Sequence, residues 1–272
     1  MPKRWHSVRR RLSAVLSQFE PLPLAFSGLR ATRLVSTVPY VGMKEHYAVA
    51  RVESGHSEWW SRGRVWRSAP GGLQLQGPGD VHRDVSRQGP IVYQIVSFPT
   101  DTVERLAGKM VLRPTLDADD PLGAPFQRLH DAVQRRAERF ELEVLTTEAI
   151  AALVAVGSWR SQETRPVRRA LELLRERMAE AITLDDLAAY AGLDKYHLCR
   201  AFRRQIGLPP HSYLTRLRVM HAKRLLHAGV RPTEVAAQVG LYDQSQLNRH
   251  FRKLVGTTPG RYFAQVSASK RA

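Results

Sequence analysis

Two stretches in the last third of the chain, LDDLAAYAGLDKYHLCRAFRRQIG at residues 184–207 and VAAQVGLYDQSQLNRHFRKLVGTTPGRYF at residues 235–263, follow one pattern. Leu187, Ala188, Gly192 and Leu193 correspond, 48 positions later, to Val235, Ala236, Gly240 and Leu241, and a one-residue insertion at Tyr242 then shifts the offset to 49. The residues that recur after the insertion are Asp194, Leu198, Arg200, Phe202, Arg203, Gly207, Pro210 and Tyr213, as Asp243, Leu247, Arg249, Phe251, Arg252, Gly256, Pro259 and Tyr262. Each copy predicts a short helix, a glycine-centred turn and a longer basic helix, which is the helix-turn-helix pattern.

The longer helix of each copy has one apolar face and one polar face. Leu198 and Phe202, four residues apart, must face the core of a small domain. Side chains near the start of a groove-bound helix reach base edges, and later basic residues neutralise phosphates. Arginine can grip guanine and glutamine can grip adenine with two hydrogen bonds. The predicted DNA-contacting residues are Lys195, Tyr196, Cys199, Arg200, Arg203, Gln244, Ser245, Gln246, Arg249 and Arg252.

Capping residues and glycines predict six helices in this part of the chain. Thr183 to Asp186 resembles a capping box with Asp in place of the usual Glu, and Asp194 and Asp243 are placed to cap the longer helices. The predicted helices run from 167 to 178, from 183 to Gly192, from 194 to Gly207, from Pro210 to Gly229, from Pro232 to Gly240 and from 243 to Gly256.

The formal net charge of +17 is concentrated in the same region. Residues 195–272 hold 15 basic and two acidic side chains, and residues 1–11 hold five basic and no acidic ones. Residues 12–160 are nearly balanced, with 17 basic against 16 acidic side chains. A surplus of this density indicates a polyanionic partner, with nucleic acid favoured over a membrane surface. The neutral middle of the chain needs a different role.

Several other classes of protein are excluded or disfavoured. The single cysteine, Cys199, rules out an internal disulfide framework and every multi-thiolate zinc site. The basic N-terminus lacks the apolar core of a signal peptide, and the longest apolar run, residues 149–156, is too short to span a bilayer. We therefore expect a soluble, cytoplasmic protein with no membrane association.

The middle of the chain predicts short strands followed by helices. The strands are expected at 32–38, 46–52, 57–60, 64–67, 72–76 and 91–98, with Gly and Pro between them, as in a barrel or jelly roll. Apolar stripes predict helices at 103–110, 123–140 and 141–157, and residues 158–166 are the best linker candidate. The helical pair either packs on the barrel or forms a dimer seam, and its stripe does not distinguish the two.

The C-terminal repeat resembles the double helix-turn-helix domain of AraC/XylS-type transcription regulators. Its A-x-x-x-G-L, L-x-R-x-F and G-x-x-P-x-x-Y elements are all present within about 80 residues, 183–263. The resemblance implies that Tyr196, Cys199 and Arg200 contact bases in the first unit, and that Ser245, Gln246 and Arg249 do so in the second.

A weaker resemblance covers about residues 20–160. Residues 63–82, GRVWRSAPGGLQLQGPGDVH, are similar to the cupin-type sensor barrel that precedes the DNA-binding domain in many of these regulators. The resemblance implies a barrel that binds a small effector, with His82, Asp84, Tyr93 and Ile95 at effector-binding positions, and dimerising helices after it. The sugar site of the family's archetype is not reproduced, so arabinose is not expected.

These features together predict an α+β fold with a cupin-like β-barrel, dimerisation helices and an all-α domain with two helix-turn-helix units. The expected parts are a basic arm at 1–20, the barrel at 21–100, helices at 101–160, a linker at 161–166 and the DNA-binding domain at 167–266. The expected partners are double-stranded promoter DNA, a small effector, a second copy of the chain and, for an activator, RNA polymerase.

Two other functions remain open from the sequence. An effector-independent or architectural DNA-binding protein would use its barrel only to dimerise. A cupin oxygenase would need a metal site, but His46, Glu53, His56 and His82 include no His-x-His pair. We expect no enzyme activity, no metal and no cofactor.

Overall fold

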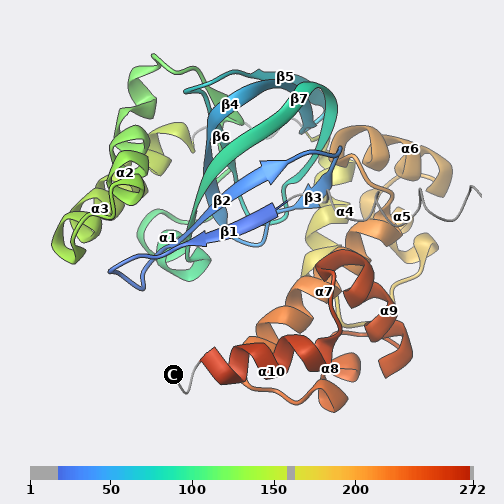
Figure 1. The fold of residues 1–272 in the computed structure, drawn as a ribbon. Coiled ribbons are helices and arrows are strands. Elements are labelled where there is room, and N and C mark those ends of the chain that lie inside the picture. The colour runs from blue at the N-terminus through green and yellow to red at the C-terminus, as the bar shows by residue number, and fades with distance from the viewer. Residues whose placement is uncertain (1–17, 158–162, 270–272) are drawn as a thin grey trace, which may run out of the picture. The chain divides into compact units, whose positions relative to one another are not determined.

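The computed structural model describes residues 18–157 and 163–269, which divide into two units with the boundary in sequence after Ser161 (Figure 1). Most of the predicted basic arm and part of the predicted linker lie outside the described residues. The first unit is rich in strands and the second contains only helices, as predicted.

The described strands of the first unit form one antiparallel sheet. Its order is β1-β2-β7-β4-β6-β8, with β3 paired to the start of β7 and β5 paired to the end of β4. The strands are β1 Gln18–Leu22, β2 Arg30–Ser36, β3 Val41–Met43, β4 Tyr47–Ser61, β5 Arg64–Ser68, β6 Leu73–Gln76, β7 Val81–Phe98 and β8 Thr115–Leu116. The long strands β4 and β7 pair along their length and curve through the whole unit, so that the sheet curls on itself (Figure 1).

Two predicted breaks are continuous strand in the structure. The prediction of separate strands at 46–52 and 57–60 was wrong, as was the start of the last strand at Ile91. Gly55 and Gly89 both have positive φ, at 90° and 77°, and the pairing of β4 with β7 shifts register around them. These glycines therefore allow bulges that bend the ribbon, where the sequence pattern had indicated turns.

The helices of the first unit cover one face of the sheet. They are α1 Thr100–Ala107, the short 3-10 helix η2 Pro121–Gly123, α2 Ala124–Gln134 and α3 Arg139–Val156. The expected second helix, 123–140, is shorter than predicted because Arg136 adopts a left-handed conformation with φ of 57°. A turn at 135–138 then lets α3 run back beside α2 (Figure 1).

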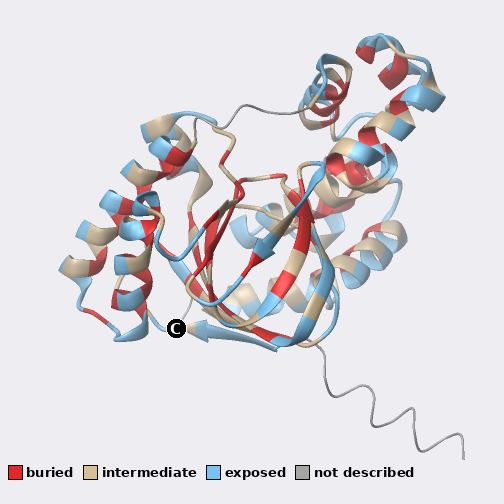
Figure 2. Ribbon diagram, turned by 90° about the horizontal axis from the view of Figure 1, so that it is seen from above, coloured by how far each residue is buried: buried red, intermediate tan, exposed pale blue. Residues whose placement is uncertain are grey.

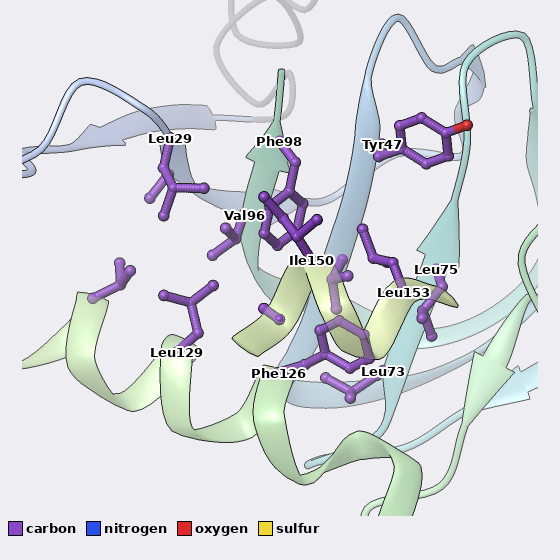
Figure 3. Packing of buried hydrophobic residues seen from close by; sticks show 14 of the residues in the cluster. Leu29, Tyr47, Leu73, Leu75, Val96, Phe98, Phe126, Leu129, Ile150 and Leu153 are labelled. Atoms are coloured by element: carbon purple, nitrogen blue, oxygen red, sulfur yellow. The ribbon is translucent and has the colours of Figure 1, made fainter. Parts of the chain in front are cut away.

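Apolar side chains join α2 and α3 to the sheet. Phe126 and Leu129 from α2 and Leu153 from α3 are buried against strand residues such as Val96 and Leu73 (Figure 3). In Figure 2 the buried positions of both helices lie on the side toward the sheet. The apolar stripe of α2 therefore packs on the sheet, while part of the surface of α3 stays exposed.

A buried polar contact reinforces this packing. The side chains of Gln94 on β7 and His130 on α2 are each about 1% exposed. His130 Nδ1 lies 3.0 Å from Gln94 Oε1, and Gln94 Nε2 donates to the carbonyl oxygen of His130 at 3.1 Å. Arg51 on β4 donates to the same Gln94 oxygen at 3.0 Å and to Asp131 at 2.5 Å. Sheet and helix are thereby held in one register.

The second unit consists of seven helices within the described residues. They are α4 Arg165–Glu176, α5 Leu184–Ala191, α6 Lys195–Ile206, α7 Pro210–Ala228, α8 Pro232–Gln238, α9 Gln244–Val255 and α10 Pro259–Ser269. Six match the predicted helices, and α10 was not predicted as a separate helix. Because α10 begins at Pro259, the counterpart of Pro210, it repeats the start of α7.

The burial of His130 generates a prediction about pH. Burial, together with the charge of Arg51, lowers the pKa of His130 to about 3, against about 6.5 in an unfolded chain. The unfolded state therefore binds a proton that the folded state excludes, so stability is complete above pH 6.5 and falls as the pH drops toward 3. We expect the free energy of unfolding to lose about 1.4 kcal/mol per pH unit from this residue.

A His130→Asn variant tests this prediction, because Asn keeps a donor for Gln94 and does not titrate. All five tryptophans lie in residues 1–161, so tryptophan fluorescence during urea unfolding follows the first unit alone. The variant should unfold with a shallower dependence on pH between 6.5 and 4. Equal pH dependence in the two proteins would contradict the prediction.

Candidate nucleic-acid interface and ligand cavity

The two copies of the sequence repeat fold into the same local structure. Gly192 and Gly240, which follow the first helix of each copy, both have φ of +72°. In both turns the next residue, Leu193 or Leu241, donates a backbone hydrogen bond that closes the turn at 3.0–3.1 Å. Left-handed backbone of this kind favours glycine, because a Cβ is strained there. Both turns therefore depend on their glycines.

The longer helix of each helix-turn-helix unit, α6 or α9, begins at a capping aspartate. Asp194 accepts from the backbone nitrogens of Tyr196 and His197, and Asp243 accepts from that of Gln246. Hydrogen bonds from the side chain and backbone of His197 lower the pKa of Asp194, which keeps this cap ionised. The predicted capping box at Thr183 and Asp186 is also present, with both reciprocal hydrogen bonds at 3.1 Å.

The apolar face of each longer helix packs in the same way. Phe202 and Tyr213 stack edge to face with ring centroids 5.7 Å apart, and Phe251 and Tyr262 do so at 5.6 Å. Leu198 and Leu247 are also buried, as predicted from their spacing. The opposite faces of α6 and α9 are therefore turned outward.

The outward face of α6 carries most of the DNA-contacting residues predicted for the first helix-turn-helix unit. Tyr196 is 74% exposed, and Arg200 and Arg203 are exposed beside it. Lys195 and Cys199 are only partly exposed, at the edge of this face. Lys195 also forms an ion pair of 3.2 Å with Asp185 on α5.

The outward face of α9 carries the DNA-contacting residues predicted for the second helix-turn-helix unit. Gln244, Ser245, Arg249 and Arg252 are exposed. Gln246 is partly buried, and its Oε1 accepts a hydrogen bond of 2.9 Å from the backbone nitrogen of Tyr242. Its amide nitrogen is the part of the side chain that remains available to a ligand.

Two further basic residues lie on these faces and were missed by the sequence analysis. Arg204 on α6 and Lys253 on α9 are exposed one position after Arg203 and Arg252. They are 49 positions apart, so the repeat offset would have identified them as an equivalent pair.

The two faces of the sheet in the first unit carry different sets of side chains. Paired residues of antiparallel strands share a face, and Val49 with Val96 lies on the face covered by α2 and α3. The opposite face, here the inner face, carries buried polar side chains of serine and glutamine: Ser57, Ser61, Ser68, Gln74 and Gln76.

All four predicted effector-binding residues lie on this inner face. The register pairs Ile95 with Ala50, Tyr93 with Val52, Asp84 with Trp59 and His82 with Ser61. Ile95 and Tyr93 pack in a small apolar cluster there, and the ring of His82 lies 5.5 Å from that of Tyr40.

A cavity of about 520 Å³ opens at the edge of the inner face, and Glu58, Arg67 and Ser86 from the opposite face also line it. Most of its lining residues are of polar types, and their formal charges balance: His56, Ser57, Glu58, Arg67, Ser68, Ala69, Ser86, Arg87, Gln88 and Asp117. The hydroxyl of Tyr93 lies 3.5 Å from Ser57 Oγ, directly behind this lining. Burial raises the pKa of Tyr93, so the hydroxyl stays protonated. None of the four predicted effector-binding residues, His82, Asp84, Tyr93 and Ile95, lines the cavity itself.

Arg87 connects the cavity to the predicted residue Asp84. Its guanidinium pairs with Asp84 and donates to the carbonyl oxygen of Ser36 at 2.9 Å. Its Nε is buried and makes no hydrogen bond within the described residues. A buried donor without an acceptor is unfavourable, so an acceptor atom of a ligand would be stabilised here.

Neither a metal centre nor a membrane span is found in the described residues. No group of three His, Cys, Asp or Glu side chains there is arranged to hold a metal ion. None of the described helices combines the length and the apolar character needed to cross a bilayer.

Comparison with known proteins matches both units. Residues 26–150 match the family model of the AraC-like ligand binding domain, and residues 187–265 match that of a helix-turn-helix domain. The chain is 30% identical over 217 residues to the "Uncharacterized HTH-type transcriptional regulator YbfI" of Bacillus subtilis, covering 75% of this chain and 79% of that protein. It is 32% identical over 90 residues to the transcriptional activator RhaS of Escherichia coli, covering 33% and 32% of the two chains.

A solved structure shares the fold. The crystal structure of ToxT from Vibrio cholerae has a TM-score of 0.50 at 11% identity, covering 88% of this chain and 97% of that one. With a sheet-rich ligand-binding unit before a double helix-turn-helix unit, the chain belongs to the AraC family of transcription regulators.

Proposed function

We propose that this DNA-binding regulator inserts α6 and α9 of one chain into successive major grooves on one face of the duplex. The observation that carries the proposal is the repeated cap, turn and outward basic helix. Successive grooves lie about 34 Å apart. A single long helix, α7, joins the two helix-turn-helix units, so one chain has the architecture to contact two half-sites.

Residues on the two helices would divide the work of recognition. Arg200 and Arg249, in the middle of each helix, would contact base edges and determine sequence preference. Arg203, Arg204, Arg252 and Lys253, farther along, would neutralise phosphates and add affinity that is independent of sequence. Counterion release would make that part of the affinity strongly salt-dependent.

The inner face of the first unit would bind the effector. The cavity lining holds Glu58 and Asp117 against Arg67 and Arg87, so its charge is balanced, and Ala69 is its only small apolar residue. An apolar ligand would leave the polar groups of the lining without hydrogen-bond partners, and a charged ligand would meet like as well as opposite charges there. The effector would therefore be an uncharged molecule rich in hydrogen-bonding groups.

The chain would act as a homodimer through α3. The exposed positions Phe140, Val144, Thr147, Ala151 and Val154 follow one another at alternating spacings of four and three residues. That spacing forms the apolar seam of a coiled coil. Phe140 is 73% exposed and Val154 is 52% exposed, so burying them against a second copy would stabilise a dimer.

This function places the protein in the cytoplasm, where chromosomal DNA is. A regulator that activates its promoter would also contact RNA polymerase. The architectural alternative is not favoured, because the first unit matches a ligand-binding domain. The enzyme alternative is not favoured either, because the relatives are transcription regulators.

The DNA contacts can be tested with a pair of variants on α9. Arg249→Ala should lower affinity for the preferred site by about 1–3 kcal/mol and relax preference at one base position. Lys253→Ala should weaken all sequences equally and reduce the dependence of binding on salt by about one counterion. Footprinting and binding titrations over a range of salt measure both effects. An unchanged sequence preference in Arg249→Ala would remove that residue from base contact.

The effector site can be tested by thermal unfolding with a panel of neutral, anionic and cationic small molecules. A neutral polar compound should raise the melting temperature of the first unit, because at 100 times its Kd it would add about 2.7 kcal/mol to the free energy of unfolding. Tyr93→Phe should reduce the shift. Tyr47→Phe, which removes a hydroxyl from the opposite face, should leave it intact. A response confined to charged compounds would contradict the proposed ligand class.

The dimer surface can be tested by adding charge to the exposed stripe of α3. Val144→Glu should dissociate the dimer at micromolar concentration, because it buries a carboxylate in the seam. Leu106→Glu on α1, at a position 67% exposed and outside the stripe, is the matched control. Sedimentation measures both. A Val144→Glu protein that remains as dimeric as the control would exclude this surface.

A further inference from the structure

The loop between α4 and α5, residues 177–182, belongs to the first helix-turn-helix unit but contacts the second. A Cβ placed on Gly240 would lie 2.6 Å from the carbonyl carbon of Ala179 and 2.8 Å from its Cα. The backbones at these two positions are therefore in direct contact. At Gly192, the equivalent glycine of the first unit, an added Cβ would meet no neighbouring atom within 4 Å, so this turn is open.

Arg218 on α7 holds the same loop from the other side. Its Nε donates to the carbonyl oxygen of Met178 and its second terminal nitrogen to that of Glu180, both at 2.7 Å. These two hydrogen bonds bracket Ala179 in the sequence. A charged planar donor that makes two short bonds fixes both position and orientation.

The helix α7 connects the two helix-turn-helix units, and the loop at 177–182 supplies a second connection between them. Tyr213 and Leu214, near the start of α7, are buried in the core of the first helix-turn-helix unit. Val219, Ala222 and Leu226, farther along α7, belong to the core of the second helix-turn-helix unit. A connection through one helix leaves bending and rotation about its axis open. A contact beside that axis, at Ala179 and Gly240, removes this freedom.

We propose that the contact between Ala179 and Gly240, held by Arg218, sets the number of base pairs that this protein accepts between its two half-sites. Adding one base pair moves a half-site by about 3.4 Å and rotates it by roughly 35°. A fixed pair of recognition helices cannot follow that change. Arg218 and Gly240 are thus positioning residues, and the inference rests on the proposed entry of α6 and α9 into successive grooves.

The test selects binding sites for the full-length chain from a library of random-sequence duplexes. The wild-type chain should enrich two half-motifs at one separation, preferred about tenfold over separations one base pair longer or shorter. Arg218→Met should enrich the same half-motifs at several separations, with preferences below about twofold. Arg224→Met is the matched control: Arg224 is exposed on the same helix and contacts His221, so its loss removes equal charge without touching the loop.

A second pair of variants tests the contact without changing charge. Gly192→Ala and Gly240→Ala impose the same backbone strain, since both residues have φ of +72°, but only the second meets Ala179. Gly240→Ala should shift or broaden the selected separation, and Gly192→Ala should keep that of the wild type.

The outcomes that overturn the inference differ from those that overturn the proposed function. A folded Arg218→Met chain, verified by its thermal transition, that selects the single wild-type separation would overturn the inference alone. A wild-type chain that enriches only one half-motif would overturn the proposed two-groove contact, and the inference with it.

Discussion

The alternation of side chains along the paired strands β4 and β7 is the constraint on which the first unit depends. Successive residues of a strand point to opposite faces, so each step along the ribbon serves either the helices or the cavity. Val49 and Val96 face the helices, and the neighbouring Ala50 and Ile95 face inward. A shift of one residue in the pairing would bury the wrong set on both faces. The bulges at Gly55 and Gly89 bend the ribbon and so bring its inner face around the cavity.

The second unit depends on a local pattern used twice. An aspartate cap, a glycine turn and an aromatic pair recur with nearly the same distances, so the two recognition helices are interchangeable in their own structure. What distinguishes them is their surroundings. In the first helix-turn-helix unit no neighbouring atom lies close to Gly192, whereas in the second Gly240 lies against Ala179. Identical modules therefore acquire different roles through the loop that contacts only one of them.

Local signals in the sequence were sufficient to predict six of the seven described helices of the second unit, all but α10. Helix caps and left-handed glycines act through residues three or four positions away, which a single sequence displays directly. The first unit was harder to predict, because glycines in a strand can mark either a turn or a bulge. Only pairing with a distant strand decides between the two, as at Gly55. The contact of Arg218 with the α4–α5 loop spans about 40 residues and leaves no local pattern, so it could not be predicted.

The polar link between sheet and helix brings the cavity and the helix pair into one mechanical unit. Tyr93 reaches the wall of the cavity through Ser57, and the next residue, Gln94, holds His130 on α2 from the other face. Adjacent residues of a strand cannot move independently, because each peptide unit is planar and rigid. A ligand that displaced β7 at Tyr93 would therefore act on α2 through a single peptide bond. The inner face and the helix-covered face are opposite sides of the same strand, and this connection links them through adjacent residues.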